Sequence, residues 1–126
     1  MSLVVIITDR PSHLGVLGLP YGPAGHSETM RIVVTGATGN VGTAVVRALV
    51  ADPAVTSVVA IARRRRNAQQ TKVEQVAADV AADDLVPLLR GAAAVVHLAW
   101  RFQPTRDPVA TWRANVLGSI RVFLAA

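Results

Sequence analysis

The chain has 126 residues, which is about the length of one globular domain. It is 52% hydrophobic and only 17% charged, a balance that excludes an intrinsically disordered chain and predicts a buried core. Thirteen Lys and Arg against eight Asp and Glu give a formal net charge of +5, which is compatible with anionic partners, and the absence of Cys excludes disulfides, zinc–cysteine sites and thiol nucleophiles.

No segment of the sequence is typical of a membrane span, a targeting signal or a metal site. A spanning helix needs about 20 consecutive apolar residues, and the apolar runs here are shorter or are interrupted by Gly and Pro. The run from Leu3 to Ile7 is preceded by no positive charge, unlike a signal peptide. The three His residues and the carboxylates lack ligand-like spacing. We therefore expect a cytoplasmic protein without membrane contact or bound metal.

The chain divides into an extension at 1–29, which is expected to be loop-like, and a domain at 30–126. Segment 11–29 is rich in Pro and Gly and has neither helical nor strand periodicity. As an alternative, the run from Leu3 to Thr8 could add an edge strand to the sheet. From Met30 onward, short β-branched runs alternate with Ala- and Leu-rich stretches, which indicates a parallel α/β sheet with flanking helices.

The expected elements of this domain follow one another as strands and helices. In chain order they are a strand at 31–35, a helix at 40–52, a strand at 57–62, a short helix or irregular stretch at 65–72, a strand at 73–77, a helix at 82–90, a strand at 93–99 and a helix from 108 to the chain end. On that last helix Trp112 and Phe123 share one stripe at helical spacing, so both are predicted to belong to the core.

The most informative segment is the glycine-rich run T-G-A-T-G-N-V-G at 35–42, between the first strand and the first helix. Such a turn aims free backbone amides, and the positive end of the helix dipole, at one point where a pyrophosphate fits. Gly36 would permit the tight turn, Gly39 the approach of the phosphates, and Gly42 the close packing of helix on strand. The alternative is a βα turn without a ligand.

The spacing of these glycines separates the loop from other phosphate-binding motifs. It is G-x-x-G-x-x-G, which differs from the usual dinucleotide fingerprint and from a P-loop. The lysine and the magnesium-binding hydroxyl of a P-loop are missing from the helix start. Kinase and NTPase chemistry is therefore disfavoured.

A run of four arginines, 63–66, stands about 20 residues beyond the last glycine, where a dinucleotide-binding unit reads the adenine ribose. No acid lies beside them, so a guanidinium–phosphate contact is available and a carboxylate–ribose contact is not. This predicts NADP over NAD, with Arg63 as the leading contact and Arg64 in reserve. The run could also bind nucleic acid, but aromatic residues make up only 4% of the chain and no basic helix face accompanies it, so a solvated basic loop is the better interpretation.

Four motifs stand in order along residues 30–126: the glycine loop, Asp79-Val80 after the third strand, V-V-H-L-A-W at 95–100 and N-V-L-G-S at 115–119. Together they resemble the N-terminal part of an extended short-chain dehydrogenase/reductase of the NAD-dependent epimerase/dehydratase type. The resemblance implies a Rossmann-type parallel sheet truncated after its fourth strand and the following helix, with NADP or NAD as cofactor. With Arg63 from the spacing argument, the candidate cofactor-binding residues are Gly36, Thr38, Gly39, Asn40, Val41, Gly42, Arg63, Asp79, Val80, Leu98, Ala99, Trp100 and Asn115.

Several of these residues have a plainer interpretation. Asp79 could cap the next helix, and Asn115 could be a polar residue on an amphipathic helix. His97 is expected to be a hydrogen-bonded histidine on a central strand and not a catalytic base. Trp100 stands where the family usually has a small residue.

The resemblance covers about the first third of such an enzyme and ends before its catalytic half. Catalysis in the family resembles acid/base chemistry by a Tyr-x-x-x-Lys pair. The single tyrosine, Tyr21, has Gly25 four residues later, and Lys72 has no tyrosine partner. No catalytic residue is therefore assigned, with Asn115 as a supporting residue at most, and a small-molecule substrate is expected only if a C-terminal half exists.

The strand order implied by the family, 3-2-1-4, leaves Ala93 to Ala99 as an apolar sheet edge. We expect self-association through that edge unless the run from Leu3 to Thr8 covers it. The leading functional hypothesis is the NAD(P)-binding portion of an oxidoreductase or of a sugar-nucleotide epimerase/dehydratase-like protein. The alternatives are a non-catalytic dinucleotide-sensing or interaction module, and a truncated gene remnant.

Overall fold

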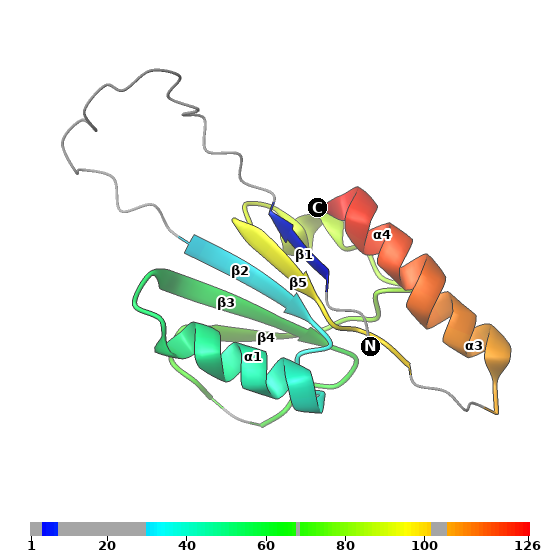
Figure 1. The fold of residues 1–126 in the computed structure, drawn as a ribbon, viewed down its shortest axis with the longest axis horizontal. Coiled ribbons are helices and arrows are strands. Elements are labelled where there is room, and N and C mark those ends of the chain that lie inside the picture. Colours follow the sequence, from blue (N-terminus) through cyan, green and yellow to red (C-terminus); the bar gives the residue numbers. More distant parts are fainter. Residues whose placement is uncertain (1–3, 8–29, 68, 102–105) are drawn as a thin grey trace, which may run out of the picture.

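The computed structural model describes residues 4–7, of which only the backbone is considered, together with 30–67, 69–101 and 106–126. These residues form one sheet with helices on both faces (Figure 1). The elements are β1 (Val4–Ile7), β2 (Met30–Thr35), α1 (Asn40–Ala51), β3 (Val55–Ala62), β4 (Val73–Ala77), α2 (Val86–Leu89), β5 (Ala94–His97), α3 (Pro108–Trp112), the π-helical turn η1 (Arg113–Leu117) and α4 (Gly118–Ala125).

The strand order across the sheet is β1-β5-β2-β3-β4. The neighbours β5, β2, β3 and β4 run parallel, which confirms the predicted 3-2-1-4 order and the Rossmann-type sheet. Parallel neighbours need crossover connections, and α1 supplies the one between β2 and β3. As a result, the carboxyl ends of these four strands meet at one edge of the sheet.

The strand β1 bears on two expectations. It pairs antiparallel with β5, in a register that sets Val4 opposite His97 and Ile7 opposite Ala94. The segment 4–7 is therefore a strand and not a loop, whereas residues 8–29 lie outside the described part of the chain. The apolar edge expected along Ala93 to Ala99 is covered over Ala94–His97 by β1, which is the alternative that the run from Leu3 to Thr8 offered. The expectation of self-association rested on that edge being uncovered.

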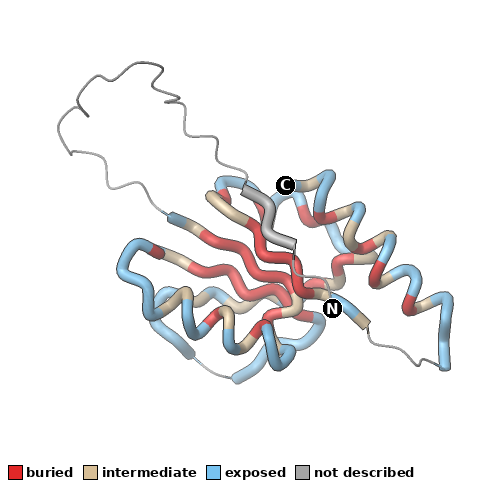
Figure 2. The backbone as a smooth tube through the Cα atoms, in the orientation of Figure 1, coloured by how far each residue is buried: buried red, intermediate tan, exposed pale blue. Residues whose placement is uncertain are grey.

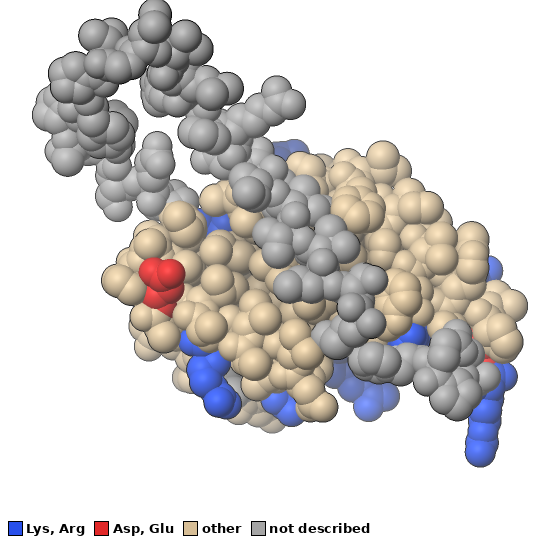
Figure 3. All heavy atoms as spheres, in the orientation of Figure 1, with Lys and Arg blue, Asp and Glu red and all other residues tan. Residues whose placement is uncertain are grey.

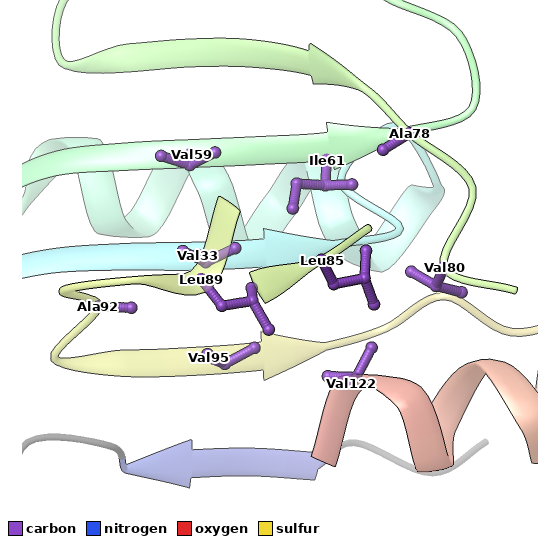
Figure 4. Close-up of a cluster of buried hydrophobic side chains, with 10 residues drawn as sticks. All are labelled: Val33, Val59, Ile61, Ala78, Val80, Leu85, Leu89, Ala92, Val95 and Val122. Atoms are coloured by element: carbon purple, nitrogen blue, oxygen red, sulfur yellow. The ribbon is translucent and has the colours of Figure 1, made fainter. Parts of the chain in front are cut away.

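Both faces of the sheet are buried, since successive residues of a strand point to opposite sides. On one face, Val33 and Ile61 pack against Leu85, Leu89 and the α4 residue Val122 (Figure 4). On the other, α1 covers a cluster that includes these buried residues: Ile32, Val34, Val46, Val58, Ala60 and Val96. Figure 2 shows this burial concentrated in the central strands.

The last helical segment presents a different face to the sheet from the one predicted. Trp112 and Phe123 are 57% and 49% exposed, so their assignment to the core is wrong. The buried residues are, in chain order, Thr111, Asn115, Gly118 and Val122. A small residue is required at the contact, because a Cβ on Gly118 would lie 2.8 Å from Cγ2 of Val80.

One other predicted helix differs in extent, since the helix expected at 82–90 is confined to Val86–Leu89. The stretch 65–72, expected as a short helix or an irregular stretch, contains no helix among its described residues. Gly91 follows α2 with a φ of +71°, as expected for a glycine that ends a helix. None of the helices in the described ranges is both long and apolar enough to cross a membrane.

Candidate functional site

A cavity of about 630 Å³ lies at the carboxyl ends of the four parallel strands. Its walls come from the segments that follow β2, β3, β4 and β5 and from one side of α3 and η1. The lining residues are Gly36, Thr38, Gly39, Asn40, Val41, Gly42, Ile61, Ala62, Arg63, Ala78, Asp79, Val80, Ala81, Ala82, Leu98, Ala99, Trp100, Arg101, Ala110, Arg113 and Ala114. All of the predicted cofactor-binding residues except Asn115 therefore face one cavity.

Two of the three loop glycines are required by the fold itself. Gly36 has a φ of +69°, and a Cβ there would lie 2.6 Å from the backbone of Leu98. At Gly42 a Cβ would overlap the carbonyl oxygen of Gly36 and lie 2.8 Å from Cα of Ala37. These two glycines let the loop turn sharply and let α1 pack closely on it.

Gly39 is different, because nothing inside the described chain requires a glycine there. Its φ of −70° and ψ of 172° suit any residue, and a Cβ would meet only the carbonyl oxygen of Gly36, at an ordinary 3.5 Å. Gly39 is also one of the residues that line the cavity. A group that approaches the backbone from the cavity is the remaining reason for a glycine at this position.

The N-terminus of α1 supplies an electropositive surface in the same wall. Gly39 is the N-cap and has no side chain to accept a hydrogen bond, and the first turn holds no acidic residue. The first amides of a helix have no partner within it, and the helix dipole adds partial positive charge at this end. The hydroxyl of Thr43 turns away, since it donates to the carbonyl oxygen of Gly39 at 2.8 Å. The start of α1 therefore presents positive electrostatic potential to the cavity.

The arginine run divides between two cavities. Arg63 lines the large cavity, whereas Arg64, Arg65 and Arg66 line a smaller one of about 90 Å³ beside Arg47 of α1. The backbone amide of Arg66 donates to Oε1 of Gln75 at 2.9 Å, which anchors the run to β4. In the described part of the chain, no hydrogen bond or ion pair engages the guanidinium groups of Arg63, Arg64 and Arg65. Figure 3 shows basic side chains gathered along the lower side of the view, with acidic atoms at only small spots.

Asp79 both shapes the loop after β4 and faces the cavity. Its Oδ1 accepts from the amide of Ala81 at 2.9 Å, and its own amide donates to Oδ2 of Asp83 at 2.6 Å. The neighbouring Val80 is buried against Gly118 of α4. Asp79 does not cap α2, whose N-cap is Leu85 without a side-chain hydrogen bond, so its carboxylate closes only the local turn while the residue lines the cavity wall.

The segment 98–101 forms the opposite wall and is held at both ends. At its start, the amides of Leu98 and Ala99 approach the hydroxyl oxygen of Thr35 at 3.2 and 3.4 Å. At its end, the side-chain amide of Asn115 donates to the carbonyl oxygen of Arg101 at 2.8 Å and accepts from its amide at 2.7 Å. Asn115 therefore fixes the wall from behind. Trp100, 42% exposed, lies on the cavity side.

His97 is buried and hydrogen-bonded through both ring nitrogens, which confirms the interpretation of a satisfied histidine on a central strand. Its Nδ1 lies 2.6 Å from Oγ1 of Thr35, and its Nε2 lies 2.9 Å from Oγ of Ser119. Burial lowers the pKa of His97 below the ordinary value of 6.5, because the charged imidazolium loses its hydration. The ring is therefore neutral near pH 7.

Comparison with protein families gives a match over most of the chain. The sequence profile of the NAD-dependent epimerase/dehydratase family matches residues 32–126. The chain belongs to this family. Among curated proteins, none matches the chain.

Solved structures of similar fold are dehydrogenases or related proteins. A uronate dehydrogenase from Agrobacterium tumefaciens superposes with a TM-score of 0.65 at 22% identity, over 79% of this chain and 36% of that one. A glucuronic acid dehydrogenase from Chromohalobacter salexigens gives 0.64 at 27%, over 76% and 35%. MoeE5 in complex with UDP-glucuronic acid and NAD gives 0.62 at 29%, over 75% and 32%. The chain thus spans about a third of the length of these proteins.

Some residues of the cavity in this epimerase/dehydratase-family chain were not predicted from the sequence. Ala110, Arg113 and Ala114 contribute one side of the last helical segment, and Arg101 extends the wall after β5. The spacing of the first three, i, i+3 and i+4, marks one helix face. Ala110 and Ala114 are small residues on this helix face, next to the buried Thr111. They were the available sequence signal that this face borders the cavity.

Proposed function

We propose that this chain is the NAD(P)-binding portion of an oxidoreductase or of a sugar-nucleotide epimerase/dehydratase-like protein, with NADP preferred over NAD. The observation that carries the proposal is Gly39, a glycine that the fold does not need, placed at an uncapped helix start in the wall of a 630 Å³ cavity. Family membership and the NAD-complexed relatives support a dinucleotide as the occupant.

The residues present fit such a cofactor along its whole length. The pyrophosphate would lie against the loop 36–42, the adenosine between Arg63 and Asp79, and the nicotinamide beside the wall 98–101. When bound, the dinucleotide supplies a hydride donor or acceptor at its nicotinamide ring. The chain itself would hold the adenosine end and the nicotinamide end of the cofactor on either side of the loop 36–42.

A second candidate function is a non-catalytic dinucleotide-sensing or interaction module. The feature behind it is that residues 1–126 contain no Tyr-x-x-x-Lys pair. Nζ of Lys72 donates to the carbonyl oxygens of Asp52 at 3.3 Å and Val50 at 3.5 Å, and Lys72 does not line the cavity. Turnover of NADPH by the purified chain with a carbonyl compound or a sugar nucleotide would exclude this second function.

The test of the proposed function is a calorimetric titration of the purified chain with NADPH, run in parallel with NADH. Saturable binding of both, with NADPH tighter, is the expected result. If neither nucleotide binds to a chain shown by circular dichroism to be folded, the proposal is wrong. Equal affinities would leave dinucleotide binding in place and overturn the preference for NADP.

We expect Arg63→Ala to weaken NADPH binding by about tenfold or more, because a guanidinium–phosphate contact is a charge-assisted hydrogen bond. NADH, which has no 2′-phosphate, should bind with nearly unchanged affinity. The matched control is Arg106→Ala, which removes the same charge from an exposed residue that lines neither cavity. An equal loss in both variants would assign the effect to net charge alone.

A further inference from the structure

A buried chain of hydrogen bonds connects the cofactor loop to the last helix. It begins at Thr35, the residue before the loop, passes through both nitrogens of His97 and reaches Ser119, whose hydroxyl donates to the carbonyl oxygen of Asn115 at 2.5 Å. Thr35, His97 and Asn115 are each less than 10% exposed. None of the side chains in this hydrogen-bonded series lines the cavity, so the proposed function does not use them directly.

Donor and acceptor can be assigned for every hydrogen bond in this series. The single proton of Ser119 goes to the carbonyl oxygen of Asn115, so Ser119 must accept from Nε2 of His97. A neutral imidazole with a proton on Nε2 has an acceptor at Nδ1, and the hydroxyl of Thr35 donates to it. The hydroxyl oxygen of Thr35 is then free to accept the amides of the next segment.

These hydrogen bonds connect the two contacts that hold the cavity wall 98–101 in place, which we call clamps. The first clamp is the hydroxyl of Thr35, and His97 fixes the orientation of that hydroxyl. The second is the side chain of Asn115, in the π-helical turn whose carbonyl oxygen the Ser119 hydroxyl engages. A π-helical turn holds its backbone less regularly than an α-helix, so an added contact from the sheet defines its position.

We propose that His97, as its neutral Nε2–H tautomer, is a positioning residue for the dinucleotide cavity, holding the wall 98–101 in register with the last helix through Thr35 and Ser119. The inference rests on the proposed function, because the wall is the part of the cavity beside the nicotinamide. His97 itself touches no cofactor. Its effect on binding passes through the hydroxyl of Thr35 and the π-helical turn.

Protonation of His97 would disrupt this arrangement. With a proton on Nδ1, the ring donates toward Thr35, whose hydroxyl must then turn its own proton away. Within the described residues, the charged side chains on the elements packed against His97 are engaged by other groups or line the cavity. Arg31 of β2 donates to the carbonyl oxygens of Leu88 and Arg90, and Arg121 of α4 donates to those of Val80 and Asp83. Arg113 of η1 lines the cavity. The segments Val4–Ile7 and Val86–Leu89 and the rest of β5 contain no titratable residue.

The pH dependence follows in sign from the lowered pKa. Between 6.5 and the lower pKa of the folded state, the unfolded chain binds a proton that the folded chain does not. The contribution of His97 is therefore complete above pH 6.5 and is lost as the pH falls through the folded pKa. Cofactor affinity compares two folded states, so we expect it to fall only where the folded chain itself takes up the proton, at and below the lowered pKa of His97. NADH is the probe to use, because the 2′-phosphate of NADPH titrates near pH 6 by itself.

The experiment compares three substitutions of His97 in the full chain, with affinity for NADH and NADPH measured from pH 5 to 8. His97→Phe keeps the ring and removes both hydrogen bonds, so we expect about tenfold weaker binding at pH 7.5, the worth of one hydrogen bond. His97→Asn keeps an acceptor for Thr35, and His97→Gln keeps a donor for Ser119. Both should recover part of the affinity, and neither should retain the acid-side loss for NADH.

The control is Thr111→Val, which removes another buried hydroxyl from the same helical segment, one that donates to the carbonyl oxygen of Asp107 at 3.0 Å. If Thr111→Val lowers stability as much as His97→Phe and weakens NADH binding equally, His97 is merely structural and the proposal fails. It also fails if His97→Phe binds as the unaltered chain does. Imidazole nitrogen shifts by NMR test the tautomer without any cofactor: a proton on Nδ1 at pH 7.5 overturns the proposal even if no dinucleotide binds.

Discussion

Replacing Gly39 by alanine is expected to weaken dinucleotide binding about 100-fold while the fold keeps its stability. The added methyl fits within the chain, at 3.5 Å from the nearest atom, and it stands on a residue that lines the cavity at the point where we propose that the pyrophosphate lies. Loss of one or two charge-assisted hydrogen bonds to the phosphates corresponds to about 100-fold weaker binding. Calorimetric titration with NADPH measures the affinity, and thermal unfolding measures the stability.

The same substitution should leave the stability of the fold unchanged or slightly higher. Because alanine restricts the unfolded chain more than glycine, and because the backbone angles at Gly39 suit it, the free energy of unfolding should stay equal or rise by about 0.5 kcal/mol. Unchanged NADPH affinity in a stable Gly39→Ala variant would contradict the assignment of the loop as the pyrophosphate site.

Gly42→Ala, three residues further on, should have the opposite profile and destabilise the fold itself. A Cβ at this position overlaps the carbonyl oxygen of Gly36 and crowds Cα of Ala37, and both contacts are to backbone that cannot rotate away. We expect a loss of about 3 kcal/mol in the free energy of unfolding, because overpacking against backbone must displace α1 from the sheet.

Chemical denaturation of Gly42→Ala beside the unaltered chain measures this loss. Gly91→Ala is a useful comparison, since at Gly91 the φ of +71° creates strain although no atom lies within 4 Å of the added Cβ. It should cost less than Gly42→Ala, about 1 kcal/mol. A larger effect at Gly91 than at Gly42 would show that steric overlap at the helix start is relieved by a shift of the loop.

The glycine loop and the parallel sheet were predictable because their determinants are local. Gly36 and Gly42 are required by contacts within the loop or with the adjacent strand, and the β-branched runs of β2 and β3 fill buried positions on both faces. Arg63 was assigned from its spacing of about 20 residues to the last glycine and Asp79 from the family resemblance, and both line the cavity because the carboxyl ends of parallel strands meet at one edge.

Features that depend on distant partners were not predicted. The orientation of the last helix was assigned from the large apolar Trp112 and Phe123, yet close contact between Gly118 and Val80 turns the smaller residues inward. The clamp by Asn115 depends on the backbone of Arg101, which no side-chain pattern reveals. The pairing of β1 with β5 was foreseen only as an alternative and not as the main expectation, because periodicity does not identify the partner of a strand about ninety residues away.

That last pairing has a consequence for the order in which the sheet can form during synthesis. Val4–Ile7 leave the ribosome early, whereas their partner Ala94–His97 is made about ninety residues later, roughly 5 to 20 s at common elongation rates. Until then β2 lacks its β5 neighbour, and only the pairings of β2 with β3 and of β3 with β4 are available to a nascent chain. The half of the cavity that holds Arg63 and Asp79 can therefore take shape before the half that holds Trp100 exists.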